Sequence, residues 1–161
     1  VYDLLMEAGT ALGVRNAGYR AIESCRLEKA YRYWSSDPTA DYTPWEAGLG
    51  FCVALDKGDF IGREALLEAK AKGPSRKLCC FTLEEYRPLN GGETILRKGE
   101  VLGVLTSGGY GYTVGSSIAY GYIPTRAAEE NDFEIEVMGE SITAIRHDGA
   151  LYDSPREKIL S

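Results

Sequence analysis

The pattern of hydrophobic residues changes once along this chain, at Gly73-Pro74, and this change limits the possible folds more than any other feature. Before it, apolar residues recur at helical spacing; after it, they alternate in short runs separated by turns. Five or six antiparallel strands in about 80 residues form a stable unit when the sheet closes, because closure removes exposed strand edges. The sequence therefore predicts an α+β chain that ends in a small antiparallel β-barrel or sandwich.

Before residue 74, helical periodicity alternates with irregular segments. Residues 35–46 contain many turn-forming residues and are expected to be irregular. Residues 49–55 alternate apolar and small side chains, which predicts a strand with one buried face. Apolar spacing predicts helices at about 2–12, from after Asn16 to about 26–28, and over 63–72.

After residue 74, no segment has convincing helical periodicity. The Lys98-Gly99 pair is expected to form a tight turn between two strands, because glycine tolerates the backbone angles that such turns need. The runs that alternate, and are therefore predicted as strands, are 78–83, 94–96, 101–106, 118–123, 133–137 and 142–146.

The charge of the chain excludes one class of partner. Its formal net charge is −6, and acidic residues exceed basic ones in both halves. No basic stripe is available to meet a phosphate backbone, so no nucleic-acid partner is expected. The sequence also has no apolar run of about 18 residues, so no membrane span is expected. The start at Val1 lacks both a Met and a basic leader region, and we expect the chain to begin within a longer protein.

The four cysteines do not predict a metal site. They form no CxxC pair, and the single histidine, His147, cannot complete a Cys/His zinc site. Cys79 and Cys80 should point to opposite faces if they lie in one strand. Reduced, structural thiols are the favoured interpretation.

Several segments in fixed order resemble the glycine cleavage T-protein superfamily. They are residues 17–29 (AGYRAIESCRLEK), 43–49 (TPWEAGL) and 60–66 (FIGREAL), followed by 106–108 (TSG) and 118–123 (IAYGYI). The strings AGYRAIES and RLEKAYRYW are more similar to the sarcosine and dimethylglycine dehydrogenases than to the free aminomethyltransferases.

This resemblance implies that residues 1–74 are the α/β end of a folate-binding domain and that residues 75–161 are the C-terminal β-barrel domain. It implies tetrahydrofolate as a cofactor and upstream domains of the same chain as partners, with FAD in one of those domains if the parent is dehydrogenase-like. In this branch the FAD domain oxidises an N-methyl amine, and the folate part captures the carbon as methylenetetrahydrofolate. The family's catalytic aspartate lies upstream, so no catalytic residue is assigned here and the chain alone is expected to be inactive.

Other members of the superfamily provide the alternatives. A glycine-cleavage aminomethyltransferase and a non-catalytic regulatory homologue are both possible, since some relatives of the dehydrogenases are regulatory subunits of a phosphatase. A folate-dependent demethylase or tRNA-modifying relative would share the barrel, although the RLEKAYRYW string favours the dehydrogenases. The expected compartment is the cytoplasm, or the mitochondrial matrix in a eukaryote.

The resemblance assigns three residues to the folate site. Phe51 stands in place of the family's folate-stacking tryptophan, and a phenyl ring can also stack on the ligand. Arg76 and Lys77 match basic residues near the glutamate tail of folate, where a charge-assisted contact is reasonable. Alternatively, Phe51 is an inward residue of an apolar strand and the basic pair is an exposed strand start. Ile22 occupies the place of the family's folate-contacting arginine, so that contact is absent.

Three charged residues and one glycine-rich run are interpreted as framework. Glu46 is expected to accept backbone N–H bonds at an irregular turn. Arg26 and Glu28 do not face one another within a helix and are expected to pair elsewhere. Residues 108–115 lack the Gly-Lys-Ser/Thr of a phosphate-binding loop, and are expected to form a mobile barrel loop that packs against the folate domain.

Overall fold

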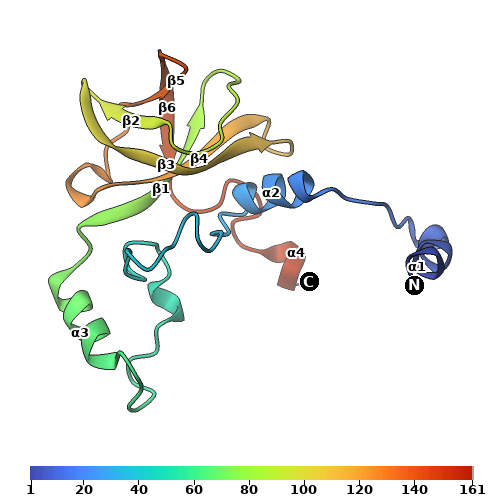
Figure 1. The fold of residues 1–161 in the computed structure, drawn as a ribbon, viewed down its shortest axis with the longest axis horizontal. Coiled ribbons are helices and arrows are strands. Elements are labelled where there is room, and N and C mark those ends of the chain that lie inside the picture. Colours follow the sequence, from blue (N-terminus) through green and yellow to red (C-terminus); the bar gives the residue numbers. More distant parts are fainter. Residues whose placement is uncertain (161) are drawn as a thin grey trace.

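The chain is built around a closed β-barrel (Figure 1). The computed structural model describes residues 1–160. All strand pairs are antiparallel, and the strands follow one another around the barrel in the order β1-β4-β3-β2-β5-β6. This confirms the predicted antiparallel β-barrel. The strands are β1 (Arg76–Leu83), β2 (Thr94–Arg97), β3 (Glu100–Gly111), β4 (Ser116–Pro124), β5 (Phe133–Val137) and β6 (Glu140–His147).

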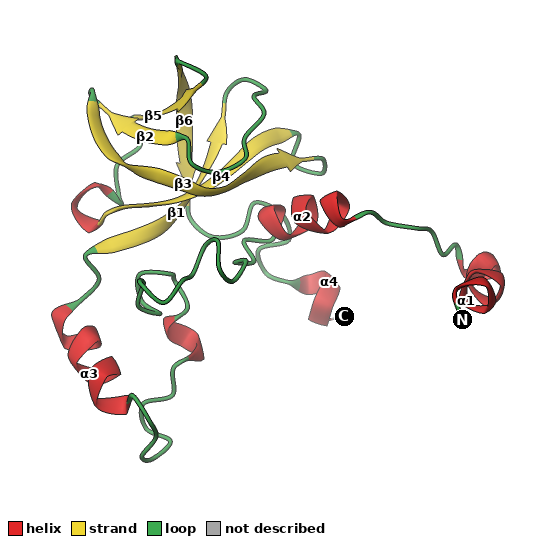
Figure 2. Cartoon of the chain, viewed as in Figure 1, coloured by secondary structure: helices red, strands yellow, loops and turns green. Residues whose placement is uncertain are grey.

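The helices lie outside the barrel, at one end of it and beyond (Figure 2). The three predicted helices are confirmed, and the last of them has the predicted bounds. In the described part of the chain, no helix is both long and apolar enough to cross a membrane. The α-helices are α1 (Tyr2–Gly9), α2 (Tyr19–Glu28), α3 (Arg63–Lys72) and α4 (Glu157–Leu160); the 3₁₀ helices are η1 (Thr10–Leu12), η2 (Gly50–Cys52) and η3 (Thr125–Ala127).

The strand predicted over residues 49–55 is wrong. This segment contains η2, and its backbone bonds are those of turns: the Leu49 N–H donates to Pro44 O at 2.7 Å and the Val53 N–H donates to Gly50 O at 3.1 Å. Among the described residues, no strand pairs with this segment, so an extended backbone would leave its polar groups without partners. The alternation of apolar residues therefore does not mark the buried face of a strand here, and Phe51 is 82% exposed.

Two hydrophobic clusters hold the structure together. The first fills the barrel, where Phe81 and Phe133 meet edge to face at 5.2 Å. The second lies outside the barrel and joins Leu27 of α2 to Ile118 of β4. The adjacent cysteines face these two clusters separately, as predicted from strand alternation: Cys79 belongs to the inner cluster and Cys80 to the outer one. Burial raises the pKa of both thiols to about 11, so they are protonated at neutral pH.

Glycines have two separate uses in the barrel. At the predicted Lys98-Gly99 turn both residues have positive φ, 51° and 77°, which is the geometry of a two-residue hairpin. The glycine run beginning at Gly108 was expected to be a loop, but β3 continues through it to Gly111. Here the missing side chains allow close packing, because a Cβ on Gly109 would lie 2.8 Å from the Leu27 side chain. The run packs against α2, as expected, but as a strand.

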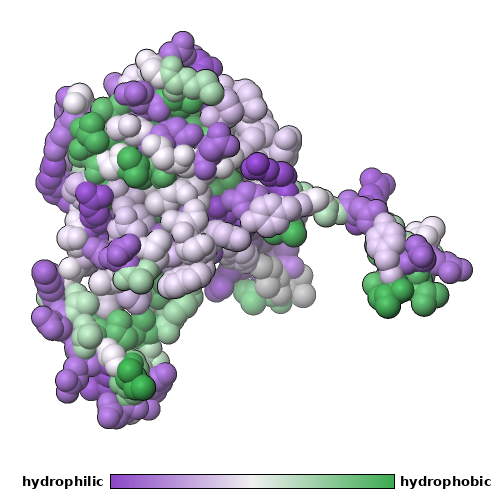
Figure 3. All heavy atoms as spheres, viewed as in Figure 1, coloured by the Kyte–Doolittle hydropathy of each residue, from purple (hydrophilic) through white to green (hydrophobic). Residues whose placement is uncertain are grey.

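The outer surface is uneven in character (Figure 3). Apolar side chains gather on α1, where Leu4 and Leu5 are exposed, and on the part of the chain around Phe51 and Ile61. In Figure 1, α1 lies away from the barrel at the end of an extended segment. The division into domains 1–74 and 75–161 stays a prediction.

Candidate functional site

Two of the three predicted site residues, Phe51 and Lys77, line cavities near the end of α2, but not the same one. Phe51 lines a cavity of about 540 Å³, together with Tyr31, Arg32 and Trp34; we call it the aromatic cavity. Lys77 lines a smaller cavity of about 110 Å³, which we call the basic cavity.

The two cavities adjoin, because Ala30, Arg32 and Gly149 line both of them. Arg76 lines neither, and its guanidinium lies next to Gly103 on β3. The structure therefore brings Phe51 and Lys77 to adjoining cavities and directs Arg76 elsewhere.

The aromatic cavity is formed where α2 ends. Ala30 follows the helix with φ of 55°, which turns the chain sharply and starts the segment that carries Tyr31, Arg32 and Trp34. The opposite wall is a C-terminal strap, residues 149–156, which returns from β6. The Leu151 N–H donates to the Glu28 carbonyl at 3.0 Å, which fixes the strap to the end of α2.

Ion pairs also tie the strap in place. The Lys29 ammonium lies 2.7 Å from the Asp153 carboxylate and donates to the Asp153 carbonyl at 3.0 Å. Asp153 has φ of 46°, so the strap bends sharply at the same residue. The aromatic cavity thus has one wall from the α2 end and one wall from the strap that follows β6.

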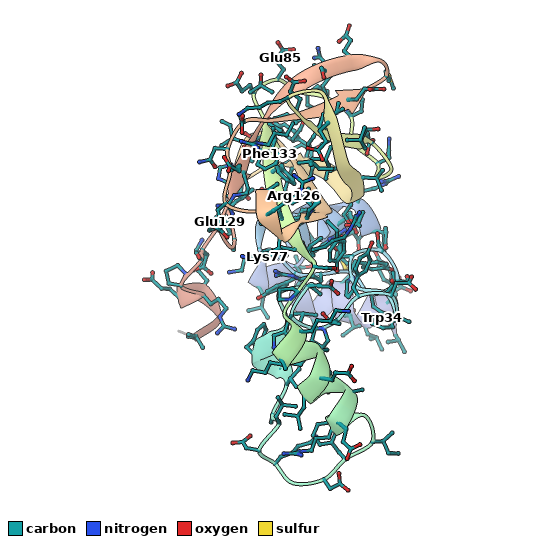
Figure 4. The ribbon with its side chains drawn as sticks, turned by 90° about the vertical axis from the view of Figure 1, so that its left-hand side faces the viewer. Trp34, Lys77, Glu85, Arg126, Glu129 and Phe133 are labelled. Carbon is teal, nitrogen blue, oxygen red and sulfur yellow. The ribbon has the colours of Figure 1, made fainter. Side chains whose placement is uncertain are left out.

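The basic cavity lies at the end of the barrel where β1 begins and β6 ends. The Lys77 ammonium lies 2.9 Å from Glu129, and Figure 4 shows the two residues side by side. The Arg146 guanidinium pairs with Asp148 at 2.6 Å and approaches Glu129 at 3.6 Å. Its Nε is buried and has no hydrogen-bond acceptor among the described residues. His147 completes this wall, and burial lowers its pKa, which favours the neutral imidazole.

A buried polar network positions the α2 end against the barrel. Asp37, which is 1% exposed, accepts hydrogen bonds from Arg26, from the Thr106 and Ser107 hydroxyls and from the Tyr33 N–H. This confirms that Arg26 belongs to the framework. The sequence did not indicate Asp37, because its partners on β3 are about 70 residues away in the chain.

The two other acidic framework residues act as caps. Glu28 accepts N–H bonds from Thr113 and Val114 at 2.6 and 3.1 Å, which closes the turn after β3. Glu46 accepts the Thr43 N–H at 2.9 Å, and the Thr43 hydroxyl accepts the Glu46 N–H in return. Burial favours the neutral acid, but the hydrogen bonds from Thr43 and Ser75 together outweigh it and hold the pKa of Glu46 below its usual value. Both predictions of a structural role are confirmed.

The part of the chain that the structure describes offers no metal-binding arrangement. No group of three or more His, Cys, Asp or Glu side chains is placed to hold an ion there. What the two cavities do offer is aromatic surface and positive charge. Sequence reasoning missed Arg32 and Trp34 as cavity residues, although they lie within the RLEKAYRYW string that carried the resemblance.

Comparison with known proteins identifies both parts of the chain. The sequence profile of the GCVT N-terminal domain matches residues 1–57, and that of the glycine cleavage T-protein C-terminal barrel domain matches residues 76–153. The solved structure of the glycine cleavage system aminomethyltransferase T from Bartonella henselae superposes with a TM-score of 0.87. It is 29% identical in sequence, over 96% of this chain and 44% of that chain.

The similar curated proteins are much longer than this chain. Human mitochondrial sarcosine dehydrogenase is 38% identical over 99% of the chain, and human mitochondrial dimethylglycine dehydrogenase is 41% identical over 90%. The mouse mitochondrial pyruvate dehydrogenase phosphatase regulatory subunit is 37% identical over 89%. The chain spans 18%, 17% and 19% of these three relatives, respectively.

Proposed function

Because this chain belongs to the glycine cleavage T-protein superfamily, we propose that it is part of a tetrahydrofolate-dependent one-carbon transfer module like that of sarcosine and dimethylglycine dehydrogenases. In such a module an N-methyl amine is oxidatively demethylated by an upstream FAD domain, and tetrahydrofolate accepts the carbon. The chain supplies one wall of the folate site and upstream domains supply the rest, including the catalytic residue. We propose a mitochondrial matrix location for a eukaryotic source and a cytoplasmic one otherwise.

The observation that carries this proposal is the aromatic cavity with the basic cavity beside it. A reduced folate has a planar ring system at one end and carboxylates at the other. Aromatic rings at Phe51 and Trp34 suit the ring system, since offset or edge contacts between rings are favourable. Positive charge at Lys77 suits a carboxylate. The 82% exposure of Phe51 is consistent with this role, because an exposed ring in a cavity wall is available to a ligand.

The first prediction concerns Phe51 and Lys77 in the complete protein that carries this chain, with Arg76 as the control. Phe51→Ala should weaken 5-formyltetrahydrofolate binding by removing a ring contact of about 0.5–1.5 kcal/mol beyond the buried area. Lys77→Ala should weaken a triglutamate form more than the monoglutamate, and less so at high salt, because exposed charges are screened. Titration calorimetry at two ionic strengths measures both effects.

Arg76→Ala serves as the matched control, since it removes the adjacent positive charge from a position outside both cavities. It should change the dissociation constant less than Lys77→Ala. If Phe51→Ala and Lys77→Ala both leave the affinities unchanged, these residues are framework and the folate assignment of this wall fails. If Arg76→Ala has the larger effect, the tail lies on the other side of β1.

The regulatory homologue remains the second candidate. It is supported by the 37% identity to a pyruvate dehydrogenase phosphatase regulatory subunit, which is comparable with the identity to the dehydrogenases. The two candidates are distinguished by whether the complete protein releases formaldehyde, or forms methylenetetrahydrofolate, from sarcosine or dimethylglycine. A protein that does neither, but still folds, supports the regulatory candidate.

A further inference from the structure

Of the described residues that line both the aromatic and the basic cavity, only Arg32 has a charged side chain. Its Nε donates to the Ala47 carbonyl at 3.1 Å, and its Nη1 donates to the Ala30 carbonyl. A guanidinium has five N–H donors in a fixed planar fork. Two are therefore used on carbonyls that hold the group in place, and three have no acceptor among the described residues.

Arg32 is also without a counter-ion. The other cations of the basic cavity are paired, Lys77 with Glu129 and Arg146 with Asp148. On the aromatic side, Lys29 is paired with Asp153, whereas Arg156 is exposed and makes no ion pair with the described residues. No carboxylate of the described residues lies within ion-pair distance of the Arg32 guanidinium, which is only partly exposed.

The charge around the two cavities has the opposite sign to that of the whole chain. Five cationic side chains line them against three carboxylates, while the net charge of the chain is −6. The carboxylates are already engaged by Lys29, Lys77 and Arg146. An anion entering the cavities therefore meets an unpaired cation, and the acidic remainder of the surface would not attract it elsewhere.

The backbone beside Arg32 is built to leave it room. A Cβ on Gly48 would lie 2.9 Å from Arg32 Nη2, and Gly48 has φ of 68°, which disfavours any other residue. Two carbonyl groups therefore hold the guanidinium in place, and the absence of a side chain at Gly48 leaves room for it. Its unused N–H groups are fixed in advance of any ligand, which reduces the entropy lost on binding.

We propose that Arg32 is the anion-recognition residue of this site and that it selects ligands that join a planar ring to a carboxylate. The ring lies in the aromatic cavity against Phe51 and Trp34, and the carboxylate accepts a two-pronged hydrogen bond from Arg32 at the entrance of the basic cavity. This inference rests on the proposed folate function and adds to it the group that distinguishes the acid from an uncharged analogue. At about 110 Å³, the basic cavity has room for one carboxylate, so further glutamates of a polyglutamate form would extend out of it along the partly exposed Lys77.

The test uses the complete protein and two probes, 5-formyltetrahydrofolate and its dimethyl ester, which keeps the rings and lacks the charges. The wild type should bind the acid more tightly than the ester. Arg32→Met should weaken the acid about tenfold or more, and should change the ester little, because only the acid loses a charge-assisted bond. Arg32→Lys should recover part of the loss, since it keeps the charge but not the fork.

Arg15→Met is the matched control, because Arg15 is exposed, lies outside both cavities, and its replacement changes the net charge equally. It should leave both affinities unchanged. Thermal melting shows whether Arg32→Met still folds. If it does not, the comparison of Arg32→Lys with the wild type tests the proposal. An equal preference for the acid over the ester in these two proteins would contradict the two-pronged hydrogen bond from Arg32.

The outcomes separate the two proposals. If the wild type binds neither probe, the folate function itself is overturned. If it binds the acid and Arg32→Met binds acid and ester with the wild-type ratio, the folate function stands and the role of Arg32 is overturned. If Arg32→Met removes the preference for the acid while Arg15→Met keeps it, Arg32 is the selecting group.

Discussion

Asp37 shows how a single side chain can hold two parts of a chain together. Its carboxylate is 1% exposed and receives four hydrogen bonds, two from β3 hydroxyls, one from Arg26 on α2 and one from its own loop. A buried carboxylate in water-free surroundings is costly unless such partners surround it. The loop that carries Trp34 is therefore fixed to the barrel by Asp37, and the aromatic cavity depends on it.

We predict that Asp37→Ala lowers the free energy of unfolding by about 1–3 kcal/mol, because the buried Arg26 loses one of its two carboxylate partners and the hydroxyls on β3 lose their shared acceptor. Asp41→Ala is the control from the same loop. Asp41 is exposed, and its replacement should cost less than about 1 kcal/mol. Urea denaturation of both variants measures the difference. Equal losses would mean that the network does not stabilise the fold.

At this scale the sequence predicted the roles that depend on near neighbours. Glu46 caps a turn formed with Thr43, three residues before it, and local spacing was enough to suggest this. Asp37 bonds residues that are distant in the chain, and Arg32 lies where two cavities meet. No local sequence pattern indicates either role. Phe51, Arg76 and Lys77 came from resemblance, and their ligand contacts stay predictions.

Among the elements, β3 and β4 depend most on an absent side chain. A Cβ on Gly103 would lie 2.1 Å from the Tyr122 carbonyl oxygen, which belongs to the backbone of β4 and cannot move independently of that strand. Glycine in a strand usually weakens it, so this position is explained by the close approach of the neighbouring backbone.

We predict that Gly103→Ala destabilises the protein by about 1–3 kcal/mol or more, because β3 and β4 must separate to admit the methyl group. Gly18→Ala is the comparison: Gly18 precedes α2 with φ of −79°, and a Cβ there would meet nothing within 4 Å. Its melting temperature should be close to that of the wild type. Equal melting temperatures for the Gly103→Ala and Gly18→Ala variants would contradict the packing argument.

Element prediction succeeded where signals local to the segment were sufficient. Helix α3 was predicted at its observed bounds, because strong helix formers are followed by Gly73, a helix terminator. The strand over 49–55 was wrong because alternation cannot show whether a neighbouring strand exists. Strand β3 extended past its predicted end because glycines that permit packing look the same in sequence as glycines that form loops.

For the whole molecule, the predicted α+β organisation with a terminal barrel is confirmed, since alternating runs and turn residues specify a closed antiparallel sheet. The placement of α1 could not be predicted. Its apolar residues predicted a helix but not what it packs against: Leu4 and Leu5 are more than 60% exposed and the helix lies apart from the barrel. The Asn16 side chain donates to the Tyr2 hydroxyl at 2.7 Å, which ties this helix to its own linker.

We predict that hydrogen exchange in the 161-residue chain is fast in α1 and slowest in the barrel. An eight-residue helix without tertiary cover is marginal in water, whereas the β1 and β5 amides lie in a closed, buried sheet. Mass-resolved exchange of peptides from 2–12 and 76–83 measures both. Protection of α1 that disappears on dilution would show that copies of the chain cover it; protection that persists would contradict the placement.

The two ends of the barrel lie close together, and this affects how the barrel can be gained or lost in evolution. Strand β1 opens the barrel and β6 closes it, and the two are antiparallel neighbours, with Cys80 opposite His147. The chain therefore enters and leaves at the same mouth. A unit with neighbouring ends can be inserted, lost or transferred between genes without moving what precedes or follows it. The barrel is therefore suited to occur as one unit in proteins of quite different length.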